Sequence, residues 1–189
     1  MSQTTNFCTK KIAIVGPEST GKSSLTLALA QYLRMPYVLE QARGYLSEIG
    51  TNYTQADVEE IARLQIAAED HFCQSNPEFL ICDTNLIVIK IWMDNAFGST
   101  PSWITEAIKT RSYALHLLTD TDFAWLPDPL REHPHLRDYF LEKYKEALNS
   151  YAIKYHLISG AEELRLSTAI NLLSAEGIIG NSAEKTLFI

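Results

Sequence analysis

The residues with the clearest chemical meaning lie near the start of the chain, in the stretch GPESTGKSS at residues 16–24. This stretch fits the pattern G-x-x-x-x-G-K-[ST], in which glycines let backbone N–H groups surround a phosphate at a helix N-terminus. We expect Lys22 to reach the β- and γ-phosphates of a nucleotide and the Ser23 hydroxyl to bind Mg²⁺. The residues predicted to bind the nucleotide are Gly16, Glu18, Ser19, Thr20, Gly21, Lys22, Ser23 and Ser24.

The sequence around this loop has the form that a phosphate loop needs. An apolar run at residues 12–15 precedes it, and an apolar-periodic segment to Leu33 follows it. A strand before the loop and a helix after it favour phosphate binding over a glycine turn with a solvated lysine.

Two acidic residues stand where short apolar runs end, and each has a possible chemical role. Asp83 is predicted to hold Mg²⁺ directly or through water; the alternative is a cap for the helix that begins near Asn85. Glu40 is predicted to accept the proton of a substrate hydroxyl that attacks the γ-phosphate, while Arg43 orients the substrate or the phosphate. The alternative for Glu40 is a helix-start carboxylate in a local ion pair.

The polar segment 120–137 carries Pro127, Pro129 and Pro134 and is predicted to be a mobile lid loop. Arg131 and Arg137 could close over the transferring phosphoryl group as catalytic cations, although arginines in polar loops are often solvated. Trp125 and Asp128 could stack on and hydrogen-bond a flat, ring-bearing substrate; alternatively, Trp125 anchors the loop to the core.

Strands alternate with helices along the chain, which predicts an α/β fold whose parallel sheet has helices on both faces. Strands are expected at residues 12–15, 37–39, 79–82, 113–118 and 154–158, and later helices at 54–75, 85–97, 101–111, 136–151 and 161–175. The charged residues of 54–75 are expected to form a solvated face, and His116 is expected to be a core histidine.

We expect residues 1–10 to be disordered, residues 11–176 to form one P-loop kinase domain, and residues 177–189 to form a tail. The apolar end of that tail, Leu187 to Ile189, could pack against the domain or mediate association into a homo-oligomer.

Composition restricts the partners and the compartment. The net charge of −7 supplies no basic surface for a phosphate backbone, which weighs against nucleic acid as the main partner. Cys8, Cys73 and Cys82 form neither a disulfide framework nor a zinc pattern, which suits a reducing cytosol. The N-terminus lacks an apolar signal-peptide core, and Lys90 interrupts the most apolar run, so we expect a cytoplasmic protein without membrane insertion.

Four motifs together resemble the ribosylnicotinamide kinase domain of NadR-type proteins, a P-loop family related to nucleoside and nucleotide kinases. They are GPESTGKS at 16–23, LEQARGYLSEIG at 39–50, LICDTN at 80–85 and WLPDPLR at 125–131, and their order and spacing also match. The resemblance covers residues 11–163 and implies a P-loop nucleoside triphosphate hydrolase fold with a five-stranded parallel sheet and a lid.

By this resemblance, the nucleotide bound at residues 16–24 is ATP. Asp83 serves the Mg²⁺ and substrate side, Glu40 and Arg43 face the acceptor, and the lid residues Trp125, Asp128 and Arg131 cover it. The implied reaction transfers the ATP γ-phosphate to the 5′-hydroxyl of ribosylnicotinamide and gives nicotinamide mononucleotide. Two positions depart from the family. Asn85, carried over to the substrate side, ends a motif that often reads D-T-D, and Pro129 stands where glycine is frequent.

Other functions stay open at this point. The longer relatives carry an adenylyltransferase domain, for which 189 residues leave no room, so the second reaction is not expected. Within the kinase class, another nucleoside or a vitamin-like alcohol is the second choice of acceptor. A different class is a nucleotide-dependent switch, an ATPase or GTPase, although the chain lacks an N-K-x-D guanine-reading motif. A nucleic-acid-processing ATPase is disfavoured by the acidic composition.

Overall fold

Five parallel strands form the centre of the molecule, in the order β2-β3-β1-β4-β5. The structure, a computed structural model, describes residues 9–180. The strands are β1 (Lys10–Val15), β2 (Tyr37–Val38), β3 (Phe79–Asp83), β4 (Leu115–Thr119) and β5 (Tyr155–Ile158). The strand that leads into the phosphate loop is therefore the middle one, flanked by β3 and β4.

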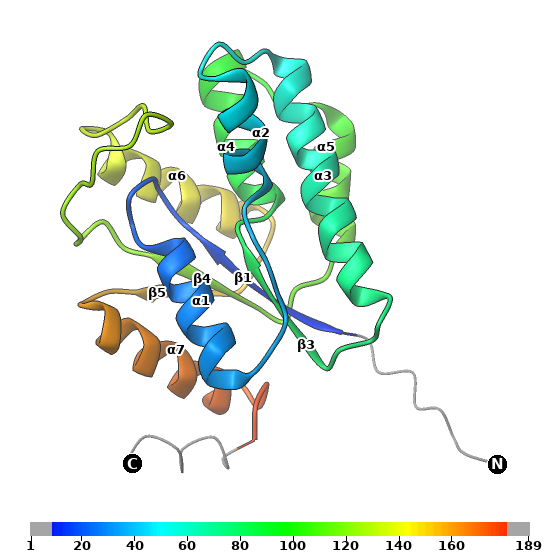
Figure 1. Ribbon diagram of the computed structural model, residues 1–189, viewed down its shortest axis with the longest axis vertical. Helices are drawn as coiled ribbons and strands as arrows, with labels where there is room; N and C mark the ends of the chain where they lie inside the picture. The colour runs from blue at the N-terminus through cyan, green and yellow to red at the C-terminus, as the bar shows by residue number, and fades with distance from the viewer. Residues whose placement is uncertain (1–8, 181–189) are drawn as a thin grey trace.

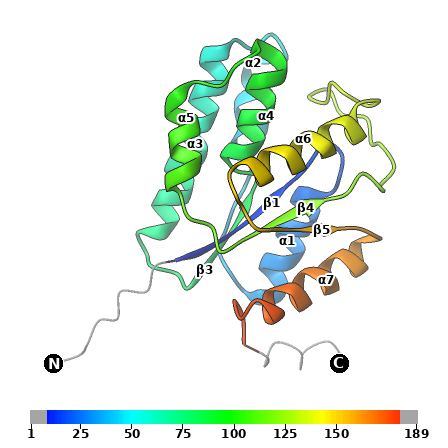
Figure 2. The ribbon, with the colours of Figure 1, turned by 180° about the vertical axis from the view of Figure 1, so that it is seen from behind.

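Helices cover both faces of this sheet (Figures 1 and 2). On one face lie α1 (Lys22–Leu33) and α7 (Glu162–Ala175). On the other face lie α2 (Gln41–Ile49), α3 (Gln55–Cys73), α4 (Leu86–Phe97), α5 (Ser102–Thr110) and α6 (Arg137–Ser150). The predicted α/β class and the parallel five-stranded sheet with two covered faces are confirmed.

The strands form here because their side chains are apolar on both faces. Ile12 and Ile14 pack among the residues of α1 and α7, whereas Ala13 and Val15 pack against the helices of the opposite face. Each of these side chains is fully buried. A parallel strand covered on both sides reads as a continuous apolar run, which is the pattern at residues 12–15.

Local capping sets where two of the helices begin. The Thr54 side chain accepts a hydrogen bond from the Asp57 backbone N–H, and Asp57 in turn accepts from the Thr54 N–H, so α3 starts with a capping box. Asn85 caps α4, because its side-chain oxygen accepts a hydrogen bond from the Ile87 N–H at 3.0 Å. These caps fix both helices at the places expected from the sequence.

Helix α2 was not predicted. It follows Glu40 directly and buries only Ala42 and Leu46, which lie four residues apart. Two apolar positions in a nine-residue helix that also contains Gly44 give too weak a period to be recognised. This helix supplies one wall of the candidate site.

The prediction of a solvated charged face on α3 was wrong for Glu69. Glu69 is 1% exposed and accepts hydrogen bonds from Lys11 Nζ at 2.9 Å, from the Tyr113 hydroxyl at 2.8 Å and from Arg111 Nη2 at 3.2 Å. These partners belong to β1 and to the segment that leads into β4, at the amino ends of the strands. Glu69 therefore ties α3 to the sheet.

The prediction that His116 is a core histidine is confirmed. It is buried, its Nε2 atom lies 2.9 Å from Asn85 Nδ2, and burial lowers its pKa to about 4. The ring is therefore neutral at pH 7, and Nε2 accepts a hydrogen bond from the Asn85 amide.

Residues 120–136 form an irregular segment between β4 and α6, seen in yellow-green beside α6 in Figure 1. After α7, Ile178 and Ile179 pack into the core around α1, so the start of the expected tail contacts the domain. The predictions for residues 1–8 and for Leu187 to Ile189 lie outside the described residues. Across residues 9–180, no helix combines the length and apolar character needed to cross a membrane.

Candidate active site

A cavity of about 430 Å³ lies at the carboxyl ends of the central strands. β1 ends at the phosphate loop, β2 ends two residues before Glu40, and β3 ends at Asp83. In open α/β sheets this edge is where ligands bind. The predicted site residues that line the cavity are Gly16, Glu18, Ser19, Gly21, Lys22, Ser23, Ser24, Glu40, Arg43 and Arg131.

The phosphate loop has a backbone that requires glycine at two positions. Gly16 has φ +146°, and a Cβ atom there would lie 2.3 Å from Thr119 Oγ1. Gly21 has φ +78° and directly precedes α1, which begins at Lys22. Both are conformations that L side chains rarely adopt. The loop thus brings backbone amides and a helix N-terminus to the cavity.

Thr20 holds this loop from behind and lies outside the cavity lining. Its side chain is buried, and its hydroxyl is 2.7 Å from both the Pro17 carbonyl oxygen and Thr119 Oγ1. Lys22 bends back over the loop, with Nζ donating to the Pro17 carbonyl at 2.8 Å. The Lys22 ammonium is also close enough to Glu40 and Asp83 to oppose the rise in their pKa values.

Asp83 lies outside the cavity lining and is 1% exposed. Burial raises the pKa of its carboxyl group, against the opposing effects of a hydrogen bond from Ser23 and the charge of Lys22. Its Oδ1 atom has no hydrogen-bond partner among residues 9–180. A buried carboxylate oxygen without a partner is costly, so this atom fits a site that a ligand completes.

Glu40 faces the cavity from the start of α2. Burial of its carboxyl group is the main cause of a raised pKa, and the negative charge of Asp83 raises the pKa further. The positive charges of Lys22 and Arg43 act in the opposite direction. The two strand-end acids therefore meet beside the phosphate loop.

Arg43 connects α2 to residues 120–136, the segment predicted to be a lid and called the lid below. Its Nη1 atom donates to Asp128 Oδ2 at 3.0 Å, while Asp128 Oδ1 accepts from the Leu130 backbone N–H at 2.9 Å. These hydrogen bonds lower the pKa of Asp128. Asp128, which lies outside the cavity lining, braces a turn of the lid here.

The lid docks directly on the phosphate loop. Glu18 Oε2 accepts hydrogen bonds from the backbone N–H groups of Glu132 at 3.1 Å and His133 at 3.2 Å. Ser19 Oγ accepts from the Leu126 N–H at 2.9 Å. This role of the Glu18 and Ser19 side chains was not predicted, because no local pattern marks contacts across more than 100 residues of sequence.

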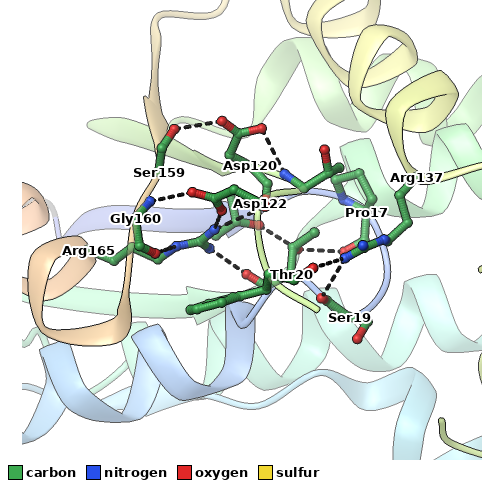
Figure 3. Close-up of polar contacts among 12 residues, drawn as sticks. Pro17, Ser19, Thr20, Asp120, Asp122, Arg137, Ser159, Gly160 and Arg165 are labelled. Atoms are coloured by element: carbon green, nitrogen blue, oxygen red, sulfur yellow. Dashed lines mark hydrogen bonds and ion pairs between the residues drawn. The ribbon is translucent and has the colours of Figure 1, made fainter. Parts of the chain in front are cut away.

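Arg131 in segment 120–136 and Arg137, the first residue of α6, lie close to Ser19. Arg131 Nη1 donates to the Leu126 carbonyl oxygen and lies 3.4 Å from Ser19 Oγ. Arg137 Nη1 donates to the Phe123 carbonyl at 2.7 Å and to the Ser19 carbonyl at 3.4 Å (Figure 3). The centroid of the Trp125 ring is 6.0 Å from the Arg131 guanidinium and 5.9 Å from that of Arg137. Trp125 thus lies beside the guanidinium groups of Arg131 and Arg137 and outside the cavity lining.

Asn85 also lies outside this cavity. Its side-chain oxygen caps α4 and its amide nitrogen contacts His116, so both polar atoms are used within the fold. The predicted contact of Asn85 with substrate is therefore corrected. The cap of this helix, considered above as the alternative role of Asp83, is formed by Asn85.

Part of the cavity lining is apolar and aromatic, and this part, called the aromatic chamber below, was not predicted from the sequence. Its apolar and aromatic lining comprises Leu46, Tyr53, Val88, Ile91, Trp92, Phe140 and Tyr144. Tyr53 and Trp92 meet edge to face with their ring centroids 4.8 Å apart. Val88, Ile91, Trp92 and Asn95 form one stripe of α4, a spacing that is typical of a core-facing helix and so does not reveal a pocket.

Comparisons with known proteins agree with this geometry. A sequence family described as an AAA domain matches residues 11–165, and a search of curated protein sequences found no match. Two solved structures of NadR, one in complex with NAD and AMP-PNP and one in complex with NR, superpose with TM-scores of 0.77 and 0.78 at 19% and 20% identity. Each comparison covers 92% of this chain and 51% of that chain, so the protein spans about half the length of those NadR chains.

A kinase that this chain covers over nearly its whole length has a similar fold. The deoxyadenosine kinase from M. mycoides, with products dCMP and a flexible dCDP bound, has a TM-score of 0.65 at 16% identity and is matched over 99% of its length and 87% of this chain. These similarities show that the chain has the fold of the NadR and deoxyadenosine kinase structures. Because the family match extends over most of the sequence, the chain belongs to the AAA domain family.

Proposed function

We propose that the protein is a small-molecule kinase that transfers the γ-phosphate of ATP to a nucleoside hydroxyl, with ribosylnicotinamide as the leading candidate acceptor. One observation carries this proposal: a single cavity combines a phosphate loop, the carboxyl group of Glu40 and a chamber lined by aromatic side chains. A nucleotide switch needs the loop, but it does not need a chamber for a second, ring-bearing molecule.

Glu40 has the properties of a general base for this transfer. The hydroxyl oxygen of the acceptor would attack the γ-phosphorus while the bond from that phosphorus to the bridging oxygen of ADP breaks. The hydroxyl proton would pass to the Glu40 carboxylate. A pKa that burial raises makes this carboxylate a stronger base at neutral pH than an exposed glutamate would be.

Ser23 and Asp83 fit a magnesium ion. The ion prefers oxygen ligands, and here a hydroxyl group and a buried carboxylate with an unpartnered Oδ1 atom lie together beside the loop. These two residues would hold the ion directly or through water. When bound, Mg²⁺ would neutralise charge on the β- and γ-phosphates.

The chamber favours a flat, ring-bearing acceptor. Trp92, Tyr53 and Phe140 offer faces and edges to a planar ring, and Asn95 and Thr51 add polar groups that could bond to an amide or a ribose. Ribosylnicotinamide has such a ring and a carboxamide, and the complex of NadR with NR adds support. Arg131 would meet the transferring phosphoryl group from the lid.

An acceptor panel tests the proposal. Purified protein with Mg²⁺ and ATP should release ADP at least about tenfold faster with ribosylnicotinamide than without an acceptor, because the bound acceptor places its hydroxyl group for attack on the γ-phosphorus. Thymidine, deoxyadenosine and adenosine provide the comparison. Lys22→Met should abolish the stimulation, whereas Trp92→Leu should mainly raise KM for the acceptor. ATP consumption that no nucleoside increases would refute the kinase proposal and favour a nucleotide-dependent switch.

A further inference from the structure

A buried arginine on α7 contacts the rear of the phosphate loop (Figure 3). Arg165 is 1% exposed, although it is charged and lies on a helix whose neighbouring residues 161–164 are exposed. Its Nη1 atom donates to the Thr20 carbonyl oxygen at 2.6 Å, and its Nε atom donates to the Gly160 carbonyl at 2.8 Å. Its Nη2 atom donates to the Asp120 carbonyl at 3.1 Å.

The charge of Arg165 is balanced by one carboxylate among the described residues, that of Asp122. Asp122 bonds to Arg165 Nη2 through one oxygen and accepts the Gly160 N–H through the other. The Arg165 guanidinium also lies 4.0 Å from the centroid of the Phe123 ring. This planar fork uses all three of its nitrogens at fixed angles, which a lysine cannot reproduce.

The contact with Thr20 bears directly on phosphate binding. A peptide group is planar and trans, so the Thr20 carbonyl and the Gly21 N–H point in opposite directions. Because Arg165 holds the carbonyl from the rear, the Gly21 N–H is directed away from Arg165, and Gly21 lines the cavity. The Phe123 ring, stacked on Arg165, leaves no room for a side chain at Gly21, since a Cβ atom there would lie 2.8 Å from the ring.

We propose that Arg165 is a positioning residue for the nucleotide triphosphate. It presets the phosphate loop and couples it to the turn at Gly160 and to the first residues of the lid at Asp120 and Asp122. None of these functions requires contact with substrate. The inference rests on the proposed function only in taking a nucleoside triphosphate as the ligand of the loop.

The test is nucleotide affinity in variants that change the fork. Arg165→Lys keeps the positive charge but cannot form the hydrogen bonds that the three guanidinium nitrogens make to Thr20, Gly160 and Asp120. It should weaken binding of Mg²⁺ with AMP-PNP by about tenfold or more in calorimetry, because hydrogen bonds to charged groups hold the loop in its binding conformation. Steady-state kinetics should show a higher KM for ATP with KM for the acceptor within about twofold of the wild type. Glu163→Gln, an exposed change on α7, is the matched control and should leave both values unchanged.

Asp122→Asn provides a second variant if Arg165→Lys does not fold. It leaves the arginine in place but removes its counter-charge, and it should weaken nucleotide binding in the same direction by a smaller factor. Wild-type affinity for AMP-PNP in a folded Arg165→Lys variant, or in Asp122→Asn where the lysine variant does not fold, would overturn the proposal. An equal loss of affinity for nucleotide and acceptor would also overturn it, since that marks general loosening. Failure of the kinase proposal is distinct, because it requires wild-type protein that does not phosphorylate an acceptor.

Discussion

Two fully buried carboxylates should respond to neutralisation in opposite ways. Asp83 lies at the carboxyl end of β3 and has an oxygen without a hydrogen-bond partner among residues 9–180. Glu69 lies at the other end of the strands and accepts hydrogen bonds from Lys11, Tyr113 and Arg111. Each is 1% exposed, so burial alone does not separate them. Their partners do.

Asp83→Asn should remove activity without weakening the fold. Loss of one preorganised electrostatic group typically costs about 10²–10³ in kcat, or about 3–4 kcal/mol of transition-state stabilisation. Burial raises the pKa of Asp83, which means that the fold disfavours its ionised form. Removing that charge should therefore leave the unfolding free energy of the protein, free of metal and nucleotide, unchanged or higher at pH 7.

Glu69→Gln should weaken the fold and spare the chemistry. The substitution leaves the Lys11 ammonium, 8% exposed, without its carboxylate partner. Breaking a buried ion pair in this way costs about 3–5 kcal/mol. For a chain of this size each 1 kcal/mol lowers Tm by about 2–4 °C, which gives a decrease of about 6–20 °C. At 20 °C the folded fraction should retain wild-type kcat.

Thermal unfolding in EDTA without nucleotide, paired with initial rates at 20 °C, measures both responses. The wild type and Glu163→Gln serve as references. A fall in Tm for Asp83→Asn as large as that for Glu69→Gln would refute the reasoning, because Asp83 would then be a structural residue. Full activity in Asp83→Asn would refute it equally.

Three further predictions follow from single contacts. Because the pKa of Glu40 is raised in the folded state, the folded protein keeps this proton to a higher pH than the unfolded chain does. The stability that this proton contributes is fully present below the pKa of Glu40 in the unfolded chain. It is lost as the pH rises through the pKa of Glu40 in the folded protein. Glu40→Gln should therefore be more stable than wild type at pH 8, lose that advantage near pH 4 in chemical unfolding, and remove the acidic limb of the pH–rate profile. Gly16→Ala should abolish AMP-PNP binding, since its Cβ atom would lie 2.3 Å from Thr119 Oγ1. In the control Gly44→Ala on α2, the added Cβ atom has no described atom within 4 Å, and this variant should gain about 0.5–1 kcal/mol of stability. Glu18→Gln weakens the acceptor of two lid N–H groups, so it should speed proteolysis within 120–136 and raise ATP hydrolysis without acceptor; unchanged values for both would contradict the docking role of Glu18.

Local patterns were sufficient to predict most of the scaffold. The apolar runs before the phosphate loop and before Asp83 predicted buried parallel strands, and Thr54 predicted the start of α3. Each of these features depends on neighbours within a few residues. The convergence of Glu40 and Asp83 also followed from local information, because parallel strands end at one edge of the sheet.

The features that were missed depend on distant parts of the chain. Glu69 looks like any other charge on an exposed helix until the fold brings Lys11 to it, across 58 residues. Arg165 is one arginine on an amphipathic helix, yet its partner Thr20 is 145 residues away. The stripe of α4 formed by Val88, Ile91, Trp92 and Asn95 has the same period whether it faces a core or a pocket. Strand order and side-chain partners at long range are set by tertiary packing, which a single sequence pattern does not encode.

The fate of the γ-phosphate tests the kinase proposal most directly. ATP labelled with ³²P at the γ-position should be incubated with the protein, Mg²⁺ and ribosylnicotinamide, and the products separated by chromatography. The proposal predicts that the label appears in nicotinamide mononucleotide in amounts equal to the ADP formed, and that Lys22→Met forms none. The same incubation is repeated with thymidine, deoxyadenosine and adenosine, and label found only in inorganic phosphate with all four nucleosides would contradict the proposal.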